Sequence, residues 1–167
     1  MNTIHERVHS IFKTAGAYSL AAKLLNAQGA SPVLLPSMVN ASLALELYFK
    51  SIYLLEYKKD FKVKDRHSHD FHALFNELTT ELKQEIEAPF NESLKNRDMR
   101  DTQQIKKIVG ITAKLDLLSN LKNWSSVFVK VRYAFDKKEI PETMMFFPEI
   151  ESALINTIKK RKPEWFA

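Results

Sequence analysis

Glu46 and Lys50 lie four residues apart in a stretch that is otherwise apolar, residues 36–57, PSMVNASLALELYFKSIYLLEY. In a helix this spacing places both side chains on one face, with the acid N-terminal to the base. A solvated pair of this kind contributes only about 0.2–0.5 kcal/mol. Burying charges costs more than that unless they pair or lie beside a ligand or a water-filled cleft. Two interpretations therefore stand: an ordinary helical ion pair, or part of a ligand-binding site.

Three of the five histidines lie in one short segment, residues 66–72, RHSHDFH. A helix that begins near Asp70 places His69 at its N-terminus, where a neutral imidazole is favoured over a charged one. No HxxxH pattern or carboxylate–histidine pair on a helix face indicates a metal site. We therefore expect no metal and no cofactor. Capping or surface roles are the alternatives to ligand binding for His69.

Arg132 is the third ionisable residue in apolar surroundings. It shares a helical face with three aromatic residues, and Tyr133 lies beside it. The guanidinium needs a carboxylate, and Glu46 from the central stretch or Asp136 one turn further on can supply it. A structural ion pair and an anion-binding arginine are about equally supported. The aromatic residues on this face are Trp124, Phe128 and Phe135.

Several enzyme classes lack their usual motifs here. The sequence has no GxxxxGK[ST], GxGxxG, GxSxG or HExxH. Ser51 and Ser125 have no histidine near them in sequence, which weakens a serine hydrolase without excluding assembly in space. With no cysteine, neither disulfides nor thiolate zinc sites can form.

Composition bounds the class of protein. A chain of 167 residues with 45% hydrophobic residues suits one folded domain, residues 1–167. The formal net charge of +5, from 25 basic and 20 acidic residues, permits nucleic-acid binding without establishing it. Charged residues near the N-terminus and interrupted apolar runs predict neither a signal peptide nor a membrane span. We expect a cytoplasmic protein.

The first half of the chain reads as two long helices. Residues near helical spacing predict a helix over residues 3–27. They are Ile4, Val8, Ile11, Phe12, Ala15, Leu20, Lys23 and Leu24. Residues 28–35 read as a loop, and Pro36 suits the first turn of the central helix, 36–57. The central helix is apolar nearly all round, so we expect it to be buried. Its inner residues are Met38, Ala41, Leu45, Tyr48, Phe49, Ile52 and Leu55.

The second half reads as shorter helices separated by loops. Residues 58–67 are polar and basic and read as a loop. Candidate caps for the two helices that follow are Ser68, His69 or Asp70 for the first and Thr79 or Thr80 for the second. Pro89 predicts a break or kink near Ala88. Helical spacing returns over residues 103–135, with Gly110 able to split it, and Pro148 can open a last helix. Inward positions of these helices include Leu82, Ile86, Phe90, Leu115, Leu118, Leu121, Ile150, Leu154 and Ile158.

These elements predict an all-α fold. We expect an up-and-down bundle of about five or six helices built round the central helix. With 3 glycines and 6 prolines, the chain lacks the turn-rich composition of β proteins.

Three segments in this order resemble the HEPN superfamily (higher eukaryotes and prokaryotes nucleotide-binding). They are ALELYFK at residues 44–50, HDFHALF at residues 69–75 and FVKVRYAFD at residues 128–136. Together they span most of the chain and are most similar to the small bacterial branch. The resemblance implies a helical bundle, often a homodimer, with a cleft formed by the matched polar residues. It also implies nucleotide or RNA binding, or RNA cleavage within toxin–antitoxin or phage-defence systems.

The ribonuclease branch of that family carries an R-x(4–6)-H motif on a late helix. No histidine follows Arg132, so the motif is absent from its usual place. Arg66 and His72 match R-x5-H in an earlier segment, and they are our candidates for a metal-independent endoribonuclease toxin. A non-catalytic protein-interaction module is the second alternative. The resemblance adds, as partners, a cognate antitoxin or a nucleotidyltransferase-type protein, and no membrane.

The leading hypothesis is a HEPN-like binding module. Its ligand site is predicted to comprise Glu46, Lys50, His69, Arg132 and Tyr133. Lys50 and Arg132 would meet phosphate, Tyr133 or Trp124 would stack on a base, and Glu46 would orient the arginine.

Overall fold

The computed structural model describes residues 3–63, 66–67, 69–96, 115–132 and 147–166. Within these residues the chain forms six α-helices, so the predicted all-α bundle is confirmed. The elements are α1 (Ile4–Ala27), α2 (Ser31–Tyr57), β1 (Lys62–Val63), β2 (Arg66–His67), α3 (Phe71–Asn76), α4 (Thr80–Lys95), α6 (Leu117–Arg132), α8 (Phe147–Arg161) and the 3₁₀ turn η1 (Pro163–Trp165).

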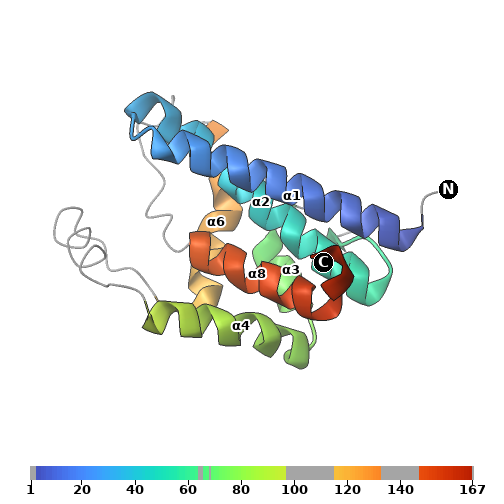
Figure 1. Cartoon of the computed structure of the whole chain (residues 1–167). Helices are drawn as coiled ribbons and strands as arrows, with labels where there is room; N and C mark the ends of the chain where they lie inside the picture. The colour runs from blue at the N-terminus through green and yellow to red at the C-terminus, as the bar shows by residue number, and fades with distance from the viewer. Residues whose placement is uncertain (1–2, 64–65, 68, 97–114, 133–146, 167) are drawn as a thin grey trace.

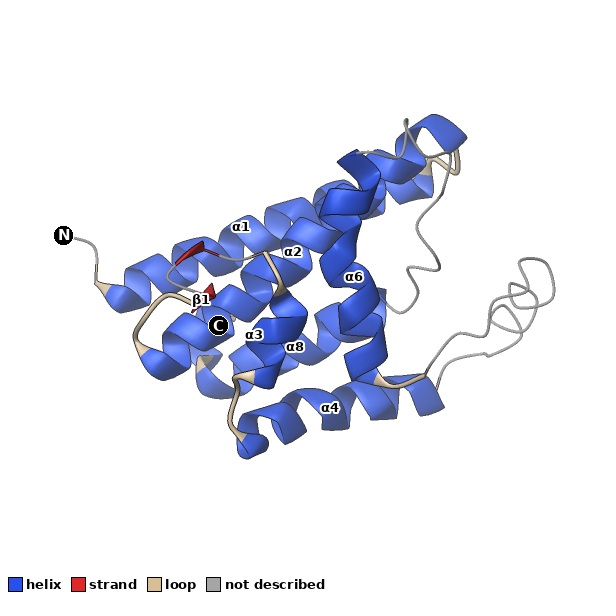
Figure 2. Ribbon diagram, turned by 180° about the vertical axis from the view of Figure 1, so that it is seen from behind, coloured by secondary structure: helices blue, strands red, loops and turns tan. Residues whose placement is uncertain are grey.

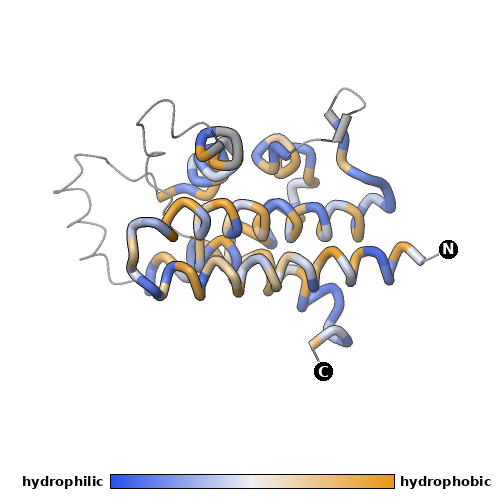
Figure 3. The backbone as a smooth tube through the Cα atoms, turned by 90° about the horizontal axis from the view of Figure 1, so that it is seen from above, coloured by the Kyte–Doolittle hydropathy of each residue, from blue (hydrophilic) through white to orange (hydrophobic). Residues whose placement is uncertain are grey.

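Helix α2 is the centre of the bundle. It packs along α1 and also contacts α3, α6 and α8, while α4 packs on the outer side of α8 (Figure 1). Figure 2 shows the opposite side, where α3 and α6 cover α2. Hydrophobic and hydrophilic turns alternate along the helices, as an amphipathic bundle requires (Figure 3).

The buried face of α2 matches the sequence prediction. All seven predicted inner residues are buried, and Leu45 and Phe49 are wholly inaccessible. Of the described helices, α2 alone is long and apolar enough to be a candidate membrane span, and half of its most apolar window is buried within the protein. A buried core helix passes the same length and composition test, so this is weak evidence for a span.

The start of α2 differs from the prediction. The helix begins at Ser31, so Pro32 occupies the first turn and Pro36 lies inside the helix. The connection from α1 is residues 28–30, where Gly29 adopts a left-handed φ of 61°. Proline near the start costs only one backbone hydrogen bond, and packing on α1 continues across it. Ser37, for example, donates a hydrogen bond of 2.9 Å to the carbonyl of Ala22.

Segment 58–67 is not simply a loop. Lys58 ends α2 in the left-handed conformation, and β1 and β2 then pair antiparallel, Lys62 with His67 and Val63 with Arg66. Among the candidate caps that follow, the structure selects Asp70 and Thr79. The Asp70 carboxylate accepts from the Ala73 amide at 2.9 Å, and the Thr79 hydroxyl accepts from the Leu82 amide at 3.3 Å.

Helix α4 continues unbroken through Pro89, so the predicted break near Ala88 is wrong. Proline has no N–H and leaves the carbonyl of the residue four positions earlier, Glu85, without its helical donor. The hydroxyl of Thr157 on α8 lies 3.3 Å from that carbonyl and 2.9 Å from the carbonyl of Ala153, so the two acceptors share its one proton. Helix α4 packs on α8, and its buried residues Leu82, Ile86 and Phe90 lie on both sides of the proline. This packing keeps the helix continuous.

Two predicted inner faces are correct only in part. Val8 and Ala15 of α1 are buried, but Leu20 and Leu24 are 58% and 60% exposed, because α1 packs on α2 through small residues that allow close approach. In α6 Leu117 is buried and Leu118 exposed, and Leu115 before the helix is exposed too. The predictions for residues 103–114, including the split at Gly110, and for residues 133–146 lie outside the described residues. The small residues through which α1 packs on α2 are Ala15, Ser19 and Ala22.

Candidate functional site

Helix α2 brings Glu46 and Lys50 together as predicted. The Lys50 Nζ lies 2.6 Å from Oε1 of Glu46. The Glu46 side chain is 7% exposed, whereas the Lys50 side chain is 24% exposed, so the acid is buried and the amine reaches the surface. A buried carboxylate is tolerated when its oxygens accept hydrogen bonds from charged donors. The pair therefore anchors a lysine at the edge of the core.

His69 is the second partner of Glu46. Its Nδ1 lies 3.0 Å from Oε1 and 3.1 Å from Oε2 of that carboxylate, and its side chain is 63% exposed. The contact exists because α3 is anchored beside α2. Phe71, in the first turn of α3, stacks on Phe49 of α2 with ring centroids 5.8 Å apart and an interplanar angle of 10°. Glu46, Lys50 and His69, three of the five residues predicted for the ligand site, thus lie in contact.

Helix α6 holds the other side of this region. The Ser42 hydroxyl of α2 donates to the carbonyl of Trp124 at 3.2 Å, and the backbone N–H of His72 donates to the Ser125 hydroxyl at 2.9 Å. Residues from α2, α3 and α6 therefore meet within one turn of Glu46 along α2. The three elements fix the backbone around the cluster.

The lysine of the cluster can serve an anionic ligand. Glu46 supplies one negative charge and Lys50 one positive charge. The lysine ammonium has three N–H donors and spends one on Glu46. Its two other donors can meet phosphate or carboxylate oxygens. Among the described residues, no group of three or more His, Asp or Glu is placed to hold a metal ion.

The other predicted site residues have mixed outcomes. Arg132 ends α6, but its side chain and the whole of Tyr133 lie outside the described residues, as does the side chain of Arg66. The predicted contacts of these three residues stay predictions. Trp124 is 3% exposed and packs its ring against Phe147, so its predicted role in stacking on a base is wrong.

A second buried carboxylate, that of Glu151, was not predicted from the sequence. Glu151 of α8 accepts a hydrogen bond from Ser19, lies 3.5 Å from the Tyr48 hydroxyl and pairs with Lys23 Nζ at 2.7 Å. Burial first, then the charge of Glu151 and its hydrogen bond, raise the pKa of Tyr48 well above its ordinary value. The signal was present in the sequence: Glu151 falls within the apolar stripe of α8, as Glu46 does in α2. This centre joins α1, α2 and α8.

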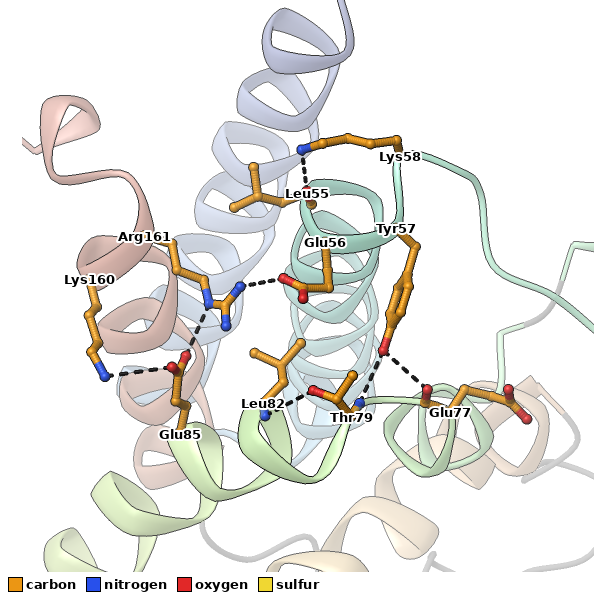
Figure 4. Close-up of polar contacts among 10 residues, drawn as sticks. All are labelled: Leu55, Glu56, Tyr57, Lys58, Glu77, Thr79, Leu82, Glu85, Lys160 and Arg161. Atoms are coloured by element: carbon orange, nitrogen blue, oxygen red, sulfur yellow. Dashed lines mark hydrogen bonds and ion pairs between the residues drawn. The ribbon is translucent and has the colours of Figure 1, made fainter.

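A third polar group ties α8 to α2 and α4. Arg161 pairs with Glu56, and its Nε lies 3.0 Å from Oε2 of Glu85, which Lys160 also approaches at 3.6 Å (Figure 4). Burial alone would lower the pKa of Arg161, but the hydrogen bonds and charges of the two glutamates outweigh it and the pKa is raised. Both carboxylates are used in holding helices together, so this group is structural.

Comparisons with known protein families, curated proteins and solved structures give no match to this chain.

Proposed function

We propose that this protein is a HEPN-like module that binds a nucleotide or RNA, with ligand phosphate at Lys50 and His69. The observation that carries the proposal is the buried Glu46 carboxylate, which holds a lysine and a histidine at the protein surface. A carboxylate that fixes two donors reduces the side-chain entropy lost when an anion binds. A purely structural pair would not need the histidine, whose side chain is more than half exposed.

The resemblance supports the same proposal from the sequence. Two of its three segments, residues 44–50 and 69–75, supply Glu46, Lys50 and His69, which lie in contact. The third segment, residues 128–136, extends from α6 beyond the described residues. On this proposal Arg132 and Tyr133 complete the site, with Arg132 meeting a second phosphate oxygen. A second copy of the chain or an antitoxin-type protein would then be its partner.

A thermal-shift titration tests the proposal. Ligand that binds the folded state raises the melting temperature with concentration. We expect ATP, GTP or a short single-stranded RNA to stabilise the wild type, and Lys50→Gln and His69→Gln to weaken the response. Lys23→Gln is the matched control, because Lys23 also pairs with a buried glutamate but lies between α1 and α8.

Two outcomes contradict the proposal. If none of these ligands stabilises the wild type, the protein has no such binding site. If Lys50→Gln and Lys23→Gln lose the response equally, the response depends on the overall charge of the protein and not on the Lys50 site. If the wild type cleaves the RNA and His72→Ala does not, the endoribonuclease alternative, with Arg66 and His72 at its centre, is established instead.

A further inference from the structure

A cluster of aromatic rings covers one end of α1. The 3₁₀ turn η1 folds back from α8 so that Trp165 stacks on His9, with ring centroids 4.7 Å apart and an interplanar angle of 23°. Phe12 lies 5.8 Å from Trp165 and 5.4 Å from Phe166 by ring centroids. Trp165 is half-buried, whereas Phe166 is 37% exposed. The cluster therefore exposes part of the Phe166 ring to solvent, next to a Trp165 ring that His9 and Phe12 hold in place.

Basic side chains lie on the two helices that carry these rings. His5, His9 and Lys13 follow each other at four-residue intervals on α1 and so lie along one face. Lys159 of α8 lies with its Nζ 5.8 Å from the Phe166 ring centroid. Two acidic residues close by already have partners. Glu6 is held in the capping box of α1, and Glu164 pairs with Lys162 at 3.2 Å.

We propose that this surface, His5, His9, Lys13, Lys159, Trp165 and Phe166, binds single-stranded nucleic acid. Proteins that bind single strands without sequence preference combine cations along the backbone with aromatic rings on which bases stack. Phe166 supplies the ring for a base, and Lys159 and Lys13 meet the flanking phosphates. His9 and Phe12 hold Trp165 from behind, which keeps the ring surface in place without a ligand.

The chemistry favours nucleic acid over an anionic membrane. A membrane-bound surface needs a broad apolar face to insert. Here Phe166 is the one ring of the cluster with more than about a third of its surface exposed, and cations flank it. The proposal shares no residue with the Glu46 cluster, so either can fail alone.

Tryptophan fluorescence of the full chain tests the proposal. A base stacked at this surface should quench Trp165, whereas Trp124 is buried and supplies a constant signal. We expect a short oligouridylate to quench the wild type but not Trp165→Phe. Phe166→Ala should weaken binding by roughly fivefold to a hundredfold, the loss expected for one base–aromatic stack. Tyr18→Ala is the matched control, because Tyr18 is also 37% exposed but lies outside the cluster.

Salt dependence supplies a second measurement. Lys159→Ala should reduce the slope of log affinity against log salt by about 0.7, the value for one phosphate contact on a single strand. Lys95→Ala, an exposed lysine on α4, should leave the slope unchanged.

Binding of oligouridylate without quenching and with full affinity in Phe166→Ala overturns this proposal and leaves the Lys50 site standing. Quenching that persists in Lys50→Gln with unchanged affinity supports it, and the thermal-shift titration decides the Lys50 site separately. Quenching by vesicles rich in phosphatidylserine, with none by oligouridylate, overturns it in favour of a membrane contact.

Discussion

The Nδ1 atom of His69 lies 3.0 Å from Oε1 of Glu46, although 23 positions separate the two residues in the chain. The same oxygen accepts from Lys50 at 2.6 Å, so one buried carboxylate holds donors from two segments. The stacked rings of Phe49 and Phe71 beneath it keep α2 and α3 in register. Glu46 is therefore the residue through which the stability of the core and the position of the surface donors are coupled.

Replacement of Glu46 should cost more stability than replacement of His69. We expect Glu46→Ala to lower the free energy of unfolding by about 1–3 kcal/mol, because a half-buried lysine loses its acceptor. His69→Ala should cost at most about 1 kcal/mol, since its side chain is largely solvated. Urea unfolding of each variant gives the values. A cost for His69→Ala equal to that for Glu46→Ala would mean that the histidine, not the carboxylate, holds the segment.

Glu151 should be as important to stability as Glu46. We expect Glu151→Ala to lower the free energy of unfolding by about 1–3 kcal/mol, because the buried hydroxyls of Ser19 and Tyr48 lose their shared acceptor. Lys23 is more than half exposed and can turn to water, which limits the loss. Glu92→Ala, an exposed glutamate on α4, is the control and should change stability by less than about 0.5 kcal/mol. Equal effects in the two variants would exclude a structural role for the Glu151 centre.

Alkaline pH should destabilise the protein through Tyr48. Burial, the charge of Glu151 and their hydrogen bond raise the pKa of Tyr48 above its ordinary 10.0 in the folded state. The folded protein therefore holds this proton more tightly than the unfolded chain does. The resulting stability is fully present below about pH 10 and is lost as pH rises above it.

Tyr48→Phe isolates this effect. The variant should show a shallower fall of unfolding free energy above pH 10 than the wild type, measured by urea unfolding at a series of pH values. Tyr53, whose pKa burial also raises, is present in both proteins and cancels from the comparison. Parallel curves for the two proteins would contradict the coupling between Tyr48 and Glu151.

Arg161 and Lys160 are neighbours with different expected effects. Arg161→Ala removes two carboxylate contacts that join α8 to α2 and α4, and should cost about 1–3 kcal/mol. Lys160→Ala removes one 3.6 Å contact from a side chain that is 71% exposed, and should cost less than about 0.5 kcal/mol. Thermal unfolding measures both. Similar costs would show that Glu85, rather than the planar guanidinium, determines this contact.

Features that depend on residues close together in the chain could be predicted from the sequence. The apolar period of α2, its ion pair at i,i+4 and the caps Asp70 and Thr79 were all predictable, because each involves residues within one turn or so. The buried setting of Glu46 followed from the apolar residues that surround it in sequence.

Tertiary packing decided the rest. Leu20 and Leu24 have the right spacing for a core face, but α1 approaches α2 through smaller residues, and nothing local distinguishes the two faces. Pro89 goes against a local rule, yet α4 continues through it where it packs on α8. The Thr157 hydroxyl of α8 lies 3.3 Å from the Glu85 carbonyl, although 72 positions separate the two residues. The same reason hid the Glu151 centre, since its partners come from two other helices. The sequence by itself determined the helices and the Glu46–Lys50 pair. The tertiary structure decided which faces meet and which buried charges share a partner, because those contacts join residues that are distant in the chain.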